Sequence, residues 1–136
     1  GFRVNMLRSA SGRAYVTFCE APVREAILDA LRRSDHPGDQ GARAPDYVAH
    51  LMRETTAQGY GLRDPDFGGD FDRGRAVVDD GRESLAVPIR LGTHVPGTLN
   101  ITWTRRVHSR DKGAALFAGP VLEAAEAVAE GLTARL

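Results

Sequence analysis

Apolar residues recur at helical spacing in the first 60 residues of the chain. The runs 21–34 and 46–58 place apolar side chains three and four positions apart, which is typical of helices with one buried face. The side chains expected to point inward from these two helices are Val23, Ile27, Leu28, Leu31, Val48, Leu51, Met52 and Thr55. A further helix is expected over residues 11–20, with Ser9 or Ser11 as its N-cap, because a serine oxygen can accept a free amide at a helix start.

Helix-breaking and turn-forming residues delimit these helices. Pro22 suits the first turn of a helix, where its missing amide hydrogen has no partner to lose. Gly59 stands where a residue in the left-handed conformation would end the helix over 46–58. Residues 35–45 are rich in Gly, Pro and Asp and are expected to form a loop, and residues 2–7 a short extended segment.

Apolar and polar residues alternate in two later segments, 82–91 and 95–105, which the short stretch Gly-Thr-His joins. Alternation indicates strands with one buried face, so the two segments predict a β-hairpin. Its apolar face consists of Leu85, Val87, Ile89, Leu99, Ile101 and Trp103. Its other face carries Ser84, Ala86, Pro88, Asn100 and Thr102.

Three further segments complete the expected order of elements. Residues 60–63 are expected to form a short strand, and residues 64–81, rich in Gly and Asp, a long loop of the kind that is usually functional or mobile. A closing helix starts at Asp111, and the pair Gly119 and Pro120 is expected to kink or interrupt it. Helices followed by a strand, a hairpin and a helix predict an α+β domain with an antiparallel sheet.

The composition carries no strong charge bias. A chain of 136 residues suits a single domain with a modest core. Its 18 basic and 18 acidic residues balance, so the chain is not expected to bind DNA by itself. Cys19 is the single cysteine, which excludes an internal disulfide and fits a cytoplasmic protein. No apolar run approaches the roughly 20 residues that cross a bilayer, so no membrane partner is expected.

Residue types that support catalysis or metal binding are scattered along the chain. The histidines are His36, His50, His94 and His108. They share no helix turn and have no cysteine or carboxylate partner at a ligand spacing. Cys19 lies inside a predicted helix, away from the helix N-termini that activate thiols, so a buried structural cysteine is expected. We therefore expect no catalytic residue, no metal and no cofactor.

Two features of the sequence could hold an anion. The stretch Ser-Ala-Ser-Gly at 9–12 opens a predicted helix, where free amides and the helix dipole favour a carboxylate or phosphate. Simple N-capping accounts for one of these serines without any ligand. The polar side chains Ser84, Asn100 and Thr102 share one face of the predicted hairpin, where they either meet solvent or line a cavity beneath helices.

Four motifs occur in an order that resembles a known family. They are MLRSASGRAYVTFC at 6–19, QGYG at 58–61, LAVPIR at 85–90 and VPGTLNITW at 95–103. This ordered set resembles the effector-binding, C-terminal domain of the IclR family of transcription regulators, and within it the branch of the activator of hydroxyphenylpropionate breakdown. The resemblance implies a GAF- or profilin-like α+β fold, an antiparallel sheet flanked by helices, with a small ligand on the sheet.

The resemblance also implies a ligand-binding site. The groups that would contact the ligand are the backbone amides of Ala10 and Ser11 and the side chains of Ser84, Asn100 and Thr102. Arg63 falls on a pocket-lining position where the family often has an acidic or other polar residue, and here it is a candidate charge partner for an anion. Tyr15, Phe18, Phe67 and Phe71 either provide apolar walls for an aromatic ligand or are ordinary core and loop anchors, and for each of them alone the sequence favours neither role.

The function expected from these residues is that of a sensor. Residues 1–136 are expected to form the ligand-sensing domain of a cytoplasmic transcription regulator, with a small organic acid, more narrowly an aromatic one, as effector. Effector binding is expected to rearrange a homodimer or homotetramer. DNA would be contacted only through a winged helix-turn-helix domain on the N-terminal side, and we expect residues 1–136 to lack this domain and the first strands of the sensor fold.

Two other functions fit the same residues. A small hydrolase or isomerase acting on a carboxylic acid would use the same pocket, although the sequence shows no base–nucleophile pair. A ligand-free oligomerisation module would instead show a fully apolar face around Asn100 and Thr102, and no cavity.

Overall fold

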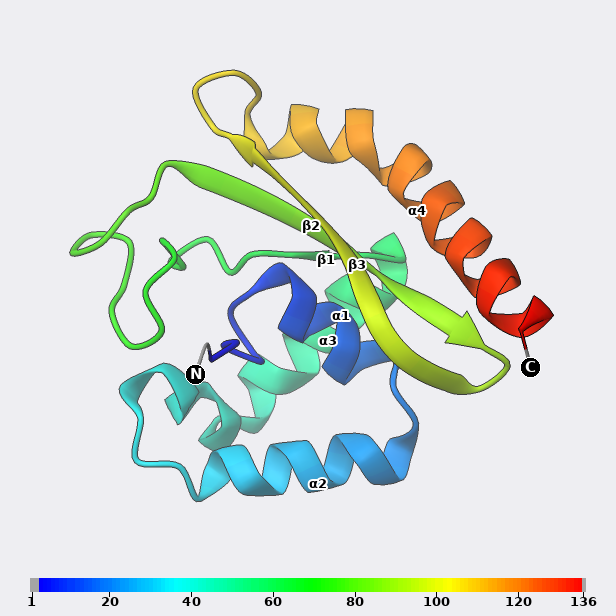
Figure 1. Ribbon diagram of the computed structural model, residues 1–136. Helices are drawn as coiled ribbons and strands as arrows, with labels where there is room; N and C mark the ends of the chain where they lie inside the picture. Colours follow the sequence, from blue (N-terminus) through cyan, green and yellow to red (C-terminus); the bar gives the residue numbers. More distant parts are fainter. Residues whose placement is uncertain (1–2, 136) are drawn as a thin grey trace.

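Helices and strands follow one another in the order that the sequence predicts. A computed structural model describes residues 3–135 of the chain (Figure 1). Its elements are α1 (Ala10–Phe18), α2 (Ala21–Arg32), the 3₁₀ helix η1 (Pro37–Arg43), α3 (Pro45–Gln58), β1 (Gly61–Leu62), β2 (Arg82–Leu91), β3 (His94–Thr104) and α4 (Arg110–Ala134). The prediction of an α+β domain with an antiparallel sheet is confirmed.

The sheet has the strand order β1-β2-β3, and both pairs of neighbours are antiparallel. The predicted hairpin of β2 and β3 is confirmed, with Leu85 opposite Ile101 and Ser84 opposite Thr102. Its turn contains Gly92 at φ 63°, a left-handed conformation that glycine adopts without strain. Because side chains alternate along a strand, this register places the apolar and polar sets on opposite faces of the sheet.

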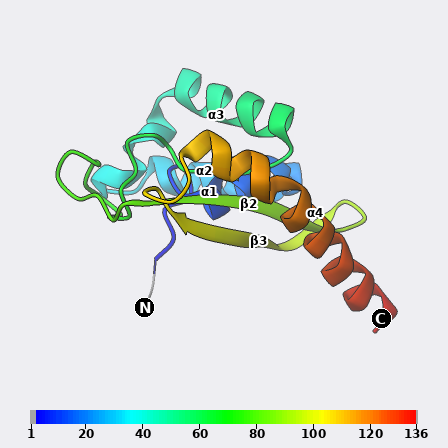
Figure 2. The same ribbon diagram turned by 90° about the horizontal axis from the view of Figure 1, so that it is seen from above.

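Helix α4 covers the apolar face of the sheet (Figure 1 and Figure 2). The buried side chains between helix and sheet are Leu62, Leu85, Val87, Trp103, Ala114, Val121 and Ala125. The Trp103 indole lies against Phe117 and donates a hydrogen bond to the His108 carbonyl at 3.1 Å. This contact holds the start of α4 against the end of β3.

Of the kink or interruption of α4 expected at Pro120, the interruption does not occur, because the helix continues from Arg110 to Ala134. Proline removes one amide donor, which leaves the carbonyl of Leu116 without its usual helix partner. Leu116 and Pro120 are both exposed, so water can satisfy that carbonyl. Neither α4 nor any other helix within residues 3–135 combines the length and apolar character that a membrane span needs.

Helix α1 lies directly on the opposite face of the sheet. Ala10 and Ala14 of α1 form a cluster of small buried side chains with Ala86 of β2. A Cβ atom at Gly61 in β1 would lie 2.5 Å from the Ala10 carbonyl oxygen, so only glycine permits this approach. Behind α1, the helices α2 and α3 enclose a second apolar cluster, which consists of Leu7, Val16, Leu28, Ala42, Val48 and Leu51.

The extended segment predicted over residues 2–7 is wrong for Met6 and Leu7, which lie in a turn. Residues 3–5 have no regular structure, and a turn follows them. The Asn5 side-chain oxygen accepts the amides of Leu7 and Arg8 at 3.2 and 2.9 Å, and this local bonding replaces the hydrogen bonds of a strand.

The predicted helix ends are confirmed, but one predicted helix face is not. Ser9 caps α1 by accepting an amide of its first turn at 3.0 Å, and Gly59 ends α3 with φ 84°. Val23, predicted to point inward, is 41% exposed, because α2 lies outermost and buries only a narrow stripe centred on Leu28. Residues 35–45, predicted to be a loop, contain η1.

We expect Gly113→Ala to lower the free energy of unfolding by about 1–3 kcal/mol, because the added methyl group enters a filled core. A Cβ atom at Gly113 would lie 2.1 Å from the Trp103 ring, which its own hydrogen bond holds in place. Urea denaturation followed by circular dichroism measures this loss. Gly131→Ala is the matched control in α4: no atom lies within 4 Å of that Cβ position, so helix propensity should raise the stability by up to about 1 kcal/mol. Equal stabilities of the two variants would contradict the packing of Trp103 on α4.

Candidate functional site

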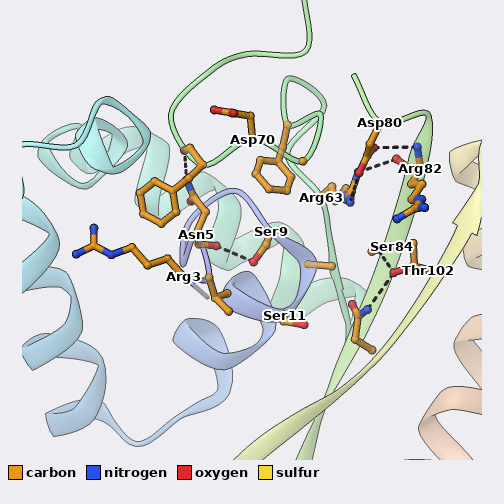
Figure 3. A pocket seen from close by; sticks show the side chains of 16 residues that line it. Arg3, Asn5, Ser9, Ser11, Arg63, Asp70, Asp80, Arg82, Ser84 and Thr102 are labelled. Atoms are coloured by element: carbon orange, nitrogen blue, oxygen red, sulfur yellow. Dashed lines mark hydrogen bonds and ion pairs between the residues drawn. The ribbon is translucent and has the colours of Figure 1, made fainter. Parts of the chain in front are cut away.

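A cavity of about 630 Å³ opens between the start of α1, the 64–81 loop and the polar face of the hairpin (Figure 3). The residues that line it are Arg3, Val4, Asn5, Ser9, Ala10, Ser11, Arg63, Phe67, Gly69, Asp70, Phe71, Asp80, Arg82, Ser84, Asn100 and Thr102. They come from segments far apart in the sequence, so the folded chain alone assembles the site. Its volume suits a small organic molecule.

The residues predicted to contact a ligand through polar groups all line this cavity: Ala10, Ser11, Arg63, Ser84, Asn100 and Thr102. Ala10 and Ser11 contribute from the start of α1. Ser84 Oγ lies 2.9 Å from Thr102 Oγ1 across the hairpin, and the Asn100 amide donates to Thr102 at 3.2 Å. The structure therefore brings the helix start and the polar stripe together, while their part in ligand binding stays a prediction.

The start of α1 offers free donors to the cavity. The Ser9 hydroxyl and carbonyl oxygens accept the amides of Gly12 and Arg13 at 3.0 Å each. No hydrogen bond within residues 3–135 satisfies the amides of Ala10 and Ser11. Two unpartnered amides at the positive end of a helix dipole form a local environment that favours a carboxylate oxygen.

Arg63 lines the cavity, but the protein already pairs its charge. The residue is 8% exposed, and its guanidinium donates to both Asp80 carboxylate oxygens at 2.8 and 3.0 Å. It also donates to the Arg82 carbonyl at 2.9 Å and lies 5.2 Å from the Phe67 ring centre. Burial opposes the charge of Asp80, but the bonds from Arg63 and the Arg82 amide outweigh burial and lower the pKa of this carboxyl. Sequence reasoning identified Arg63 and missed its partner.

The base of the 64–81 loop is tied to the sheet by a network of ion pairs on the α4 side. Glu83 of β2, 1% exposed, lies 3.0 Å from Arg75 and 3.5 Å from Arg110. Arg105 after β3 pairs with Asp79 at 2.6 Å. Several charges that share buried or half-buried partners hold a loop better than isolated surface pairs do. The loop thus has a defined position over the cavity.

Asn5 and Arg8 hold the far part of the same loop. The buried Asn5 amide donates to the Gly38 carbonyl at 3.1 Å and to the Phe71 carbonyl at 2.8 Å. The Arg8 guanidinium donates to the Phe71 carbonyl at 3.1 Å and lies 5.2 Å from the Phe67 ring centre. Sequence reasoning missed both residues, because no motif marks a side chain whose partners are backbone carbonyls 33 to 66 positions away.

A buried polar cluster fixes the position of α1 relative to the end of β1. Arg13 pairs with Asp64 at 2.8 Å, and the Tyr47 hydroxyl of α3 donates to the same carboxylate at 2.7 Å. Burial opposes the charge of Asp64, but hydrogen bonds, that of Tyr47 first among them, outweigh burial and lower the pKa of this carboxyl. Burial and the bond to Asp64 raise the pKa of Tyr47 to about 12, so its hydroxyl stays protonated and keeps donating.

The aromatic walls are only half as predicted. Phe67 and Phe71 line the cavity, and both belong to the 64–81 loop. The expectation for Tyr15 and Phe18 is wrong, because neither is among the lining residues. Phe18 lies at the far end of α1, where its ring contacts the Arg90 guanidinium at 4.8 Å. The aromatic surface of the cavity therefore comes from the loop and not from the helix.

Three further observations concern the alternatives left by the sequence. Cys19 lies outside it and is buried, as predicted, and burial raises the pKa of its thiol. Within residues 3–135 no group of three or more His, Cys, Asp or Glu side chains is placed to hold a metal ion. The oligomerisation module without a ligand predicted an apolar face and no cavity, whereas Asn100 and Thr102 line an open cavity that has both polar and apolar side chains on its wall.

The fold is similar to those of several transcription regulators. A candidate transcriptional regulator from Rhodococcus sp. RHA1 matches with a TM-score of 0.66 and 17% identity, over 97% of this chain and 48% of that one. The repressor BlcR of Agobacterium tumefaciens matches with a TM-score of 0.66 and 20% identity, over 96% of this chain and 48% of its own. An IclR family transcriptional regulator from Brucella abortus matches with a TM-score of 0.58 and 19% identity, over 96% and 43% of the two chains.

The similarity is one of fold, because identities of 17 to 20% are low. No protein-family model matches the chain. The chain spans about half the length of these three regulators: the matched region covers 43 to 48% of each of them. The α+β architecture expected from the sequence is thus that of a domain found in transcription regulators.

We expect Asp64→Asn to lower the free energy of unfolding by about 1–3 kcal/mol at pH 7, because Arg13 loses its buried counter-ion. The folded-state pKa of Asp64 lies below the unfolded value of about 3.9. Its carboxylate therefore contributes stability above about pH 4, and this contribution disappears as the pH falls through the folded-state pKa. Urea titrations should show the difference in stability between wild type and variant narrowing as the pH falls below about 4.

Asp66→Asn is the control for this prediction. The Asp66 side chain is 71% exposed and lies 3.9 Å from Arg8, so its loss should change the stability by less than about 0.5 kcal/mol. The cluster around Arg13 would not anchor α1 if the loss of stability in Asp64→Asn were also below about 0.5 kcal/mol, or if it did not vary with pH.

Proposed function

We propose that residues 1–136 form the ligand-sensing domain of a transcription regulator of the IclR type, and that its cavity binds a small organic acid. The observation that carries this proposal is that two sets of polar groups line one cavity. Ala10 and Ser11, whose amides have no partner within residues 3–135, line the same cavity as the polar side chains Ser84, Asn100 and Thr102. The fold shared with transcription regulators supports a sensing role for that space.

The ligand is held at two ends in this proposal. Its carboxylate accepts hydrogen bonds from the amides of Ala10 and Ser11, where the helix dipole adds to the attraction. Hydroxyl and amide groups of the β2–β3 stripe donate to the same carboxylate or to a ring hydroxyl. The apolar body lies against Phe67 and Phe71 of the loop, which favours an aromatic acid of the phenylpropanoid type.

Binding between α1, the hairpin and the 64–81 loop gives the ligand a means of control. A ligand shifts an equilibrium between two arrangements only by its difference in affinity for them. Here the acid would favour one arrangement of sensor domains in a homodimer or homotetramer. That arrangement would set the spacing of winged helix-turn-helix domains carried elsewhere in the protein, which would bind DNA in the cytoplasm.

A receptor fits the cavity better than a hydrolase or isomerase does. The lining residues include no histidine, cysteine or lysine that could act as a base or nucleophile. The Ser84 hydroxyl, the most buried one on the stripe, has the Thr102 hydroxyl as its partner and not a base. The candidate proton acceptors on this wall are two carboxylates that already accept hydrogen bonds, Asp70 from the amides of Asp72 and Arg73, and Asp80 from Arg63.

A thermal-shift screen against benzoate, 3-phenylpropionate, hexanoate and related acids tests the proposal. An acid at about 100 times its dissociation constant should stabilise the fold by about 2.7 kcal/mol. We expect Asn100→Ala to weaken binding of that acid at least about fivefold, because the cavity loses one donor.

Thr104→Ala is the matched control, because Thr104 lies on the same face of β3 but outside the lining residues. It should leave the affinity unchanged. Wild-type protein that responds to none of the acids would overturn the proposal. An equal loss of affinity in both variants would remove Asn100 from the site.

A further inference from the structure

The cavity wall has two places for a negative charge, and the fold fills one of them. The amides of Ala10 and Ser11 have no partner within residues 3–135. Arg63, by contrast, is already paired with Asp80 (Figure 3). We propose that Asp80 is a specificity-determining residue, which restricts the cavity to ligands with a single carboxylate because a carboxylate of the protein holds the second anion position. This inference rests on the proposed function, since it concerns the acid that the same cavity takes.

The Asp80 carboxylate is held from several sides. Arg63 donates to both of its oxygens, at 2.8 and 3.0 Å, and the Arg82 amide donates to one of them at 3.0 Å. The backbone amide of Asp80 donates to the Gly68 carbonyl at 2.9 Å. Gly69, at φ 101°, makes room for the carboxylate, since a Cβ atom there would lie 2.6 Å from Asp80 Oδ2. Asp80 is therefore a built part of the wall and not a loose counter-ion.

Arg63 is equally restrained, so the pair does not open easily toward a ligand. Its guanidinium is nearly buried, packs against Phe67 and makes a two-point contact with the carboxylate, the strong geometry for this kind of pair. A ligand carboxylate that took Arg63 would leave Asp80 without its main partner at the edge of the same cavity. Replacing the Asp80 carboxylate by a ligand carboxylate at Arg63 gains little binding energy, and it adds the cost of leaving Asp80 unpaired.

The charges on the wall match one ligand carboxylate. Arginines 3, 63 and 82 and aspartates 70 and 80 line the cavity, which gives a formal charge of +1. Arg3 and Arg82 are exposed, so water and salt weaken their attraction for a second carboxylate. A monocarboxylate neutralises the wall. A dicarboxylate carries more negative charge than the wall can neutralise, and it brings its second carboxylate toward Asp80. Repulsion between these two like charges then disfavours the dicarboxylate.

Isothermal titration calorimetry with matched pairs of acids tests this role. The pairs are hexanoate with adipate, and 3-phenylpropionate with 3-(4-carboxyphenyl)propionate. Wild-type protein should bind the monocarboxylate of a pair at least about tenfold more tightly. Asp80→Asn keeps an oxygen that accepts from Arg63 and from the Arg82 amide, so circular dichroism should show the same fold. This variant should shift the ratio at least about tenfold in favour of the dicarboxylate.

Asp70→Asn is the matched control, because it changes the charge of the same wall equally without freeing Arg63. It should alter the ratio less than about threefold. An unchanged ratio in Asp80→Asn, or an equal shift in Asp70→Asn, would overturn the role of Asp80 and leave the proposed function standing. Wild-type protein that prefers dicarboxylates would also overturn it, even if the variant did not fold. Failure of every monocarboxylate to bind wild-type protein would overturn the proposed function, and this inference with it.

Discussion

The close approach of α1 to the sheet is the constraint on which the candidate site depends. Small residues on both sides make it possible: Ala10 and Ala14 on the helix, Gly61 and Ala86 on the strands. Any side chain at Gly61 would push the Ala10 carbonyl outward, and the start of α1 would leave the polar stripe of the hairpin. The cavity exists because the helix covers the sheet at Ala86 and stops short of the next pair along the strands, Ser84 and Thr102.

Arginine–carboxylate pairs then hold the remaining wall in place. On the α4 side of the sheet, Glu83 forms ion pairs with both Arg75 and Arg110 beneath the loop. On the cavity side, Arg63 forms an ion pair with Asp80. Planar guanidinium groups suit this work because they make several directed hydrogen bonds from one side chain. A loop rich in glycine and aspartate thereby acquires a defined path without any regular structure of its own. The pair of Arg63 and Asp80 also contributes to the charge of the cavity wall.

The sequence predicted the donors of the site better than its counter-charges. Alternation along the hairpin identified Ser84, Asn100 and Thr102 as one face, because strand geometry alone decides which side chains share a face. The sequence did not identify Asp80 and Asn5, because their hydrogen-bond partners come close only when the chain folds. Arg63 shows both sides of this: its place on the wall was predicted, and its pairing was not.

The sequence by itself determined the elements, their order and the two faces of the hairpin, because helical spacing, strand alternation, caps and turns are local properties of the chain. Helix ends at Ser9 and Gly59 follow from the same local rules. Only the tertiary structure decided that the start of α1, the loop and the polar stripe enclose one cavity. It also decided that Asp80 forms an ion pair with Arg63, the buried arginine of the cavity wall. Those facts depend on packing distances between segments far apart in the sequence. The approach of a helix to a glycine and the pairing of two charges become definite only when the whole chain has folded.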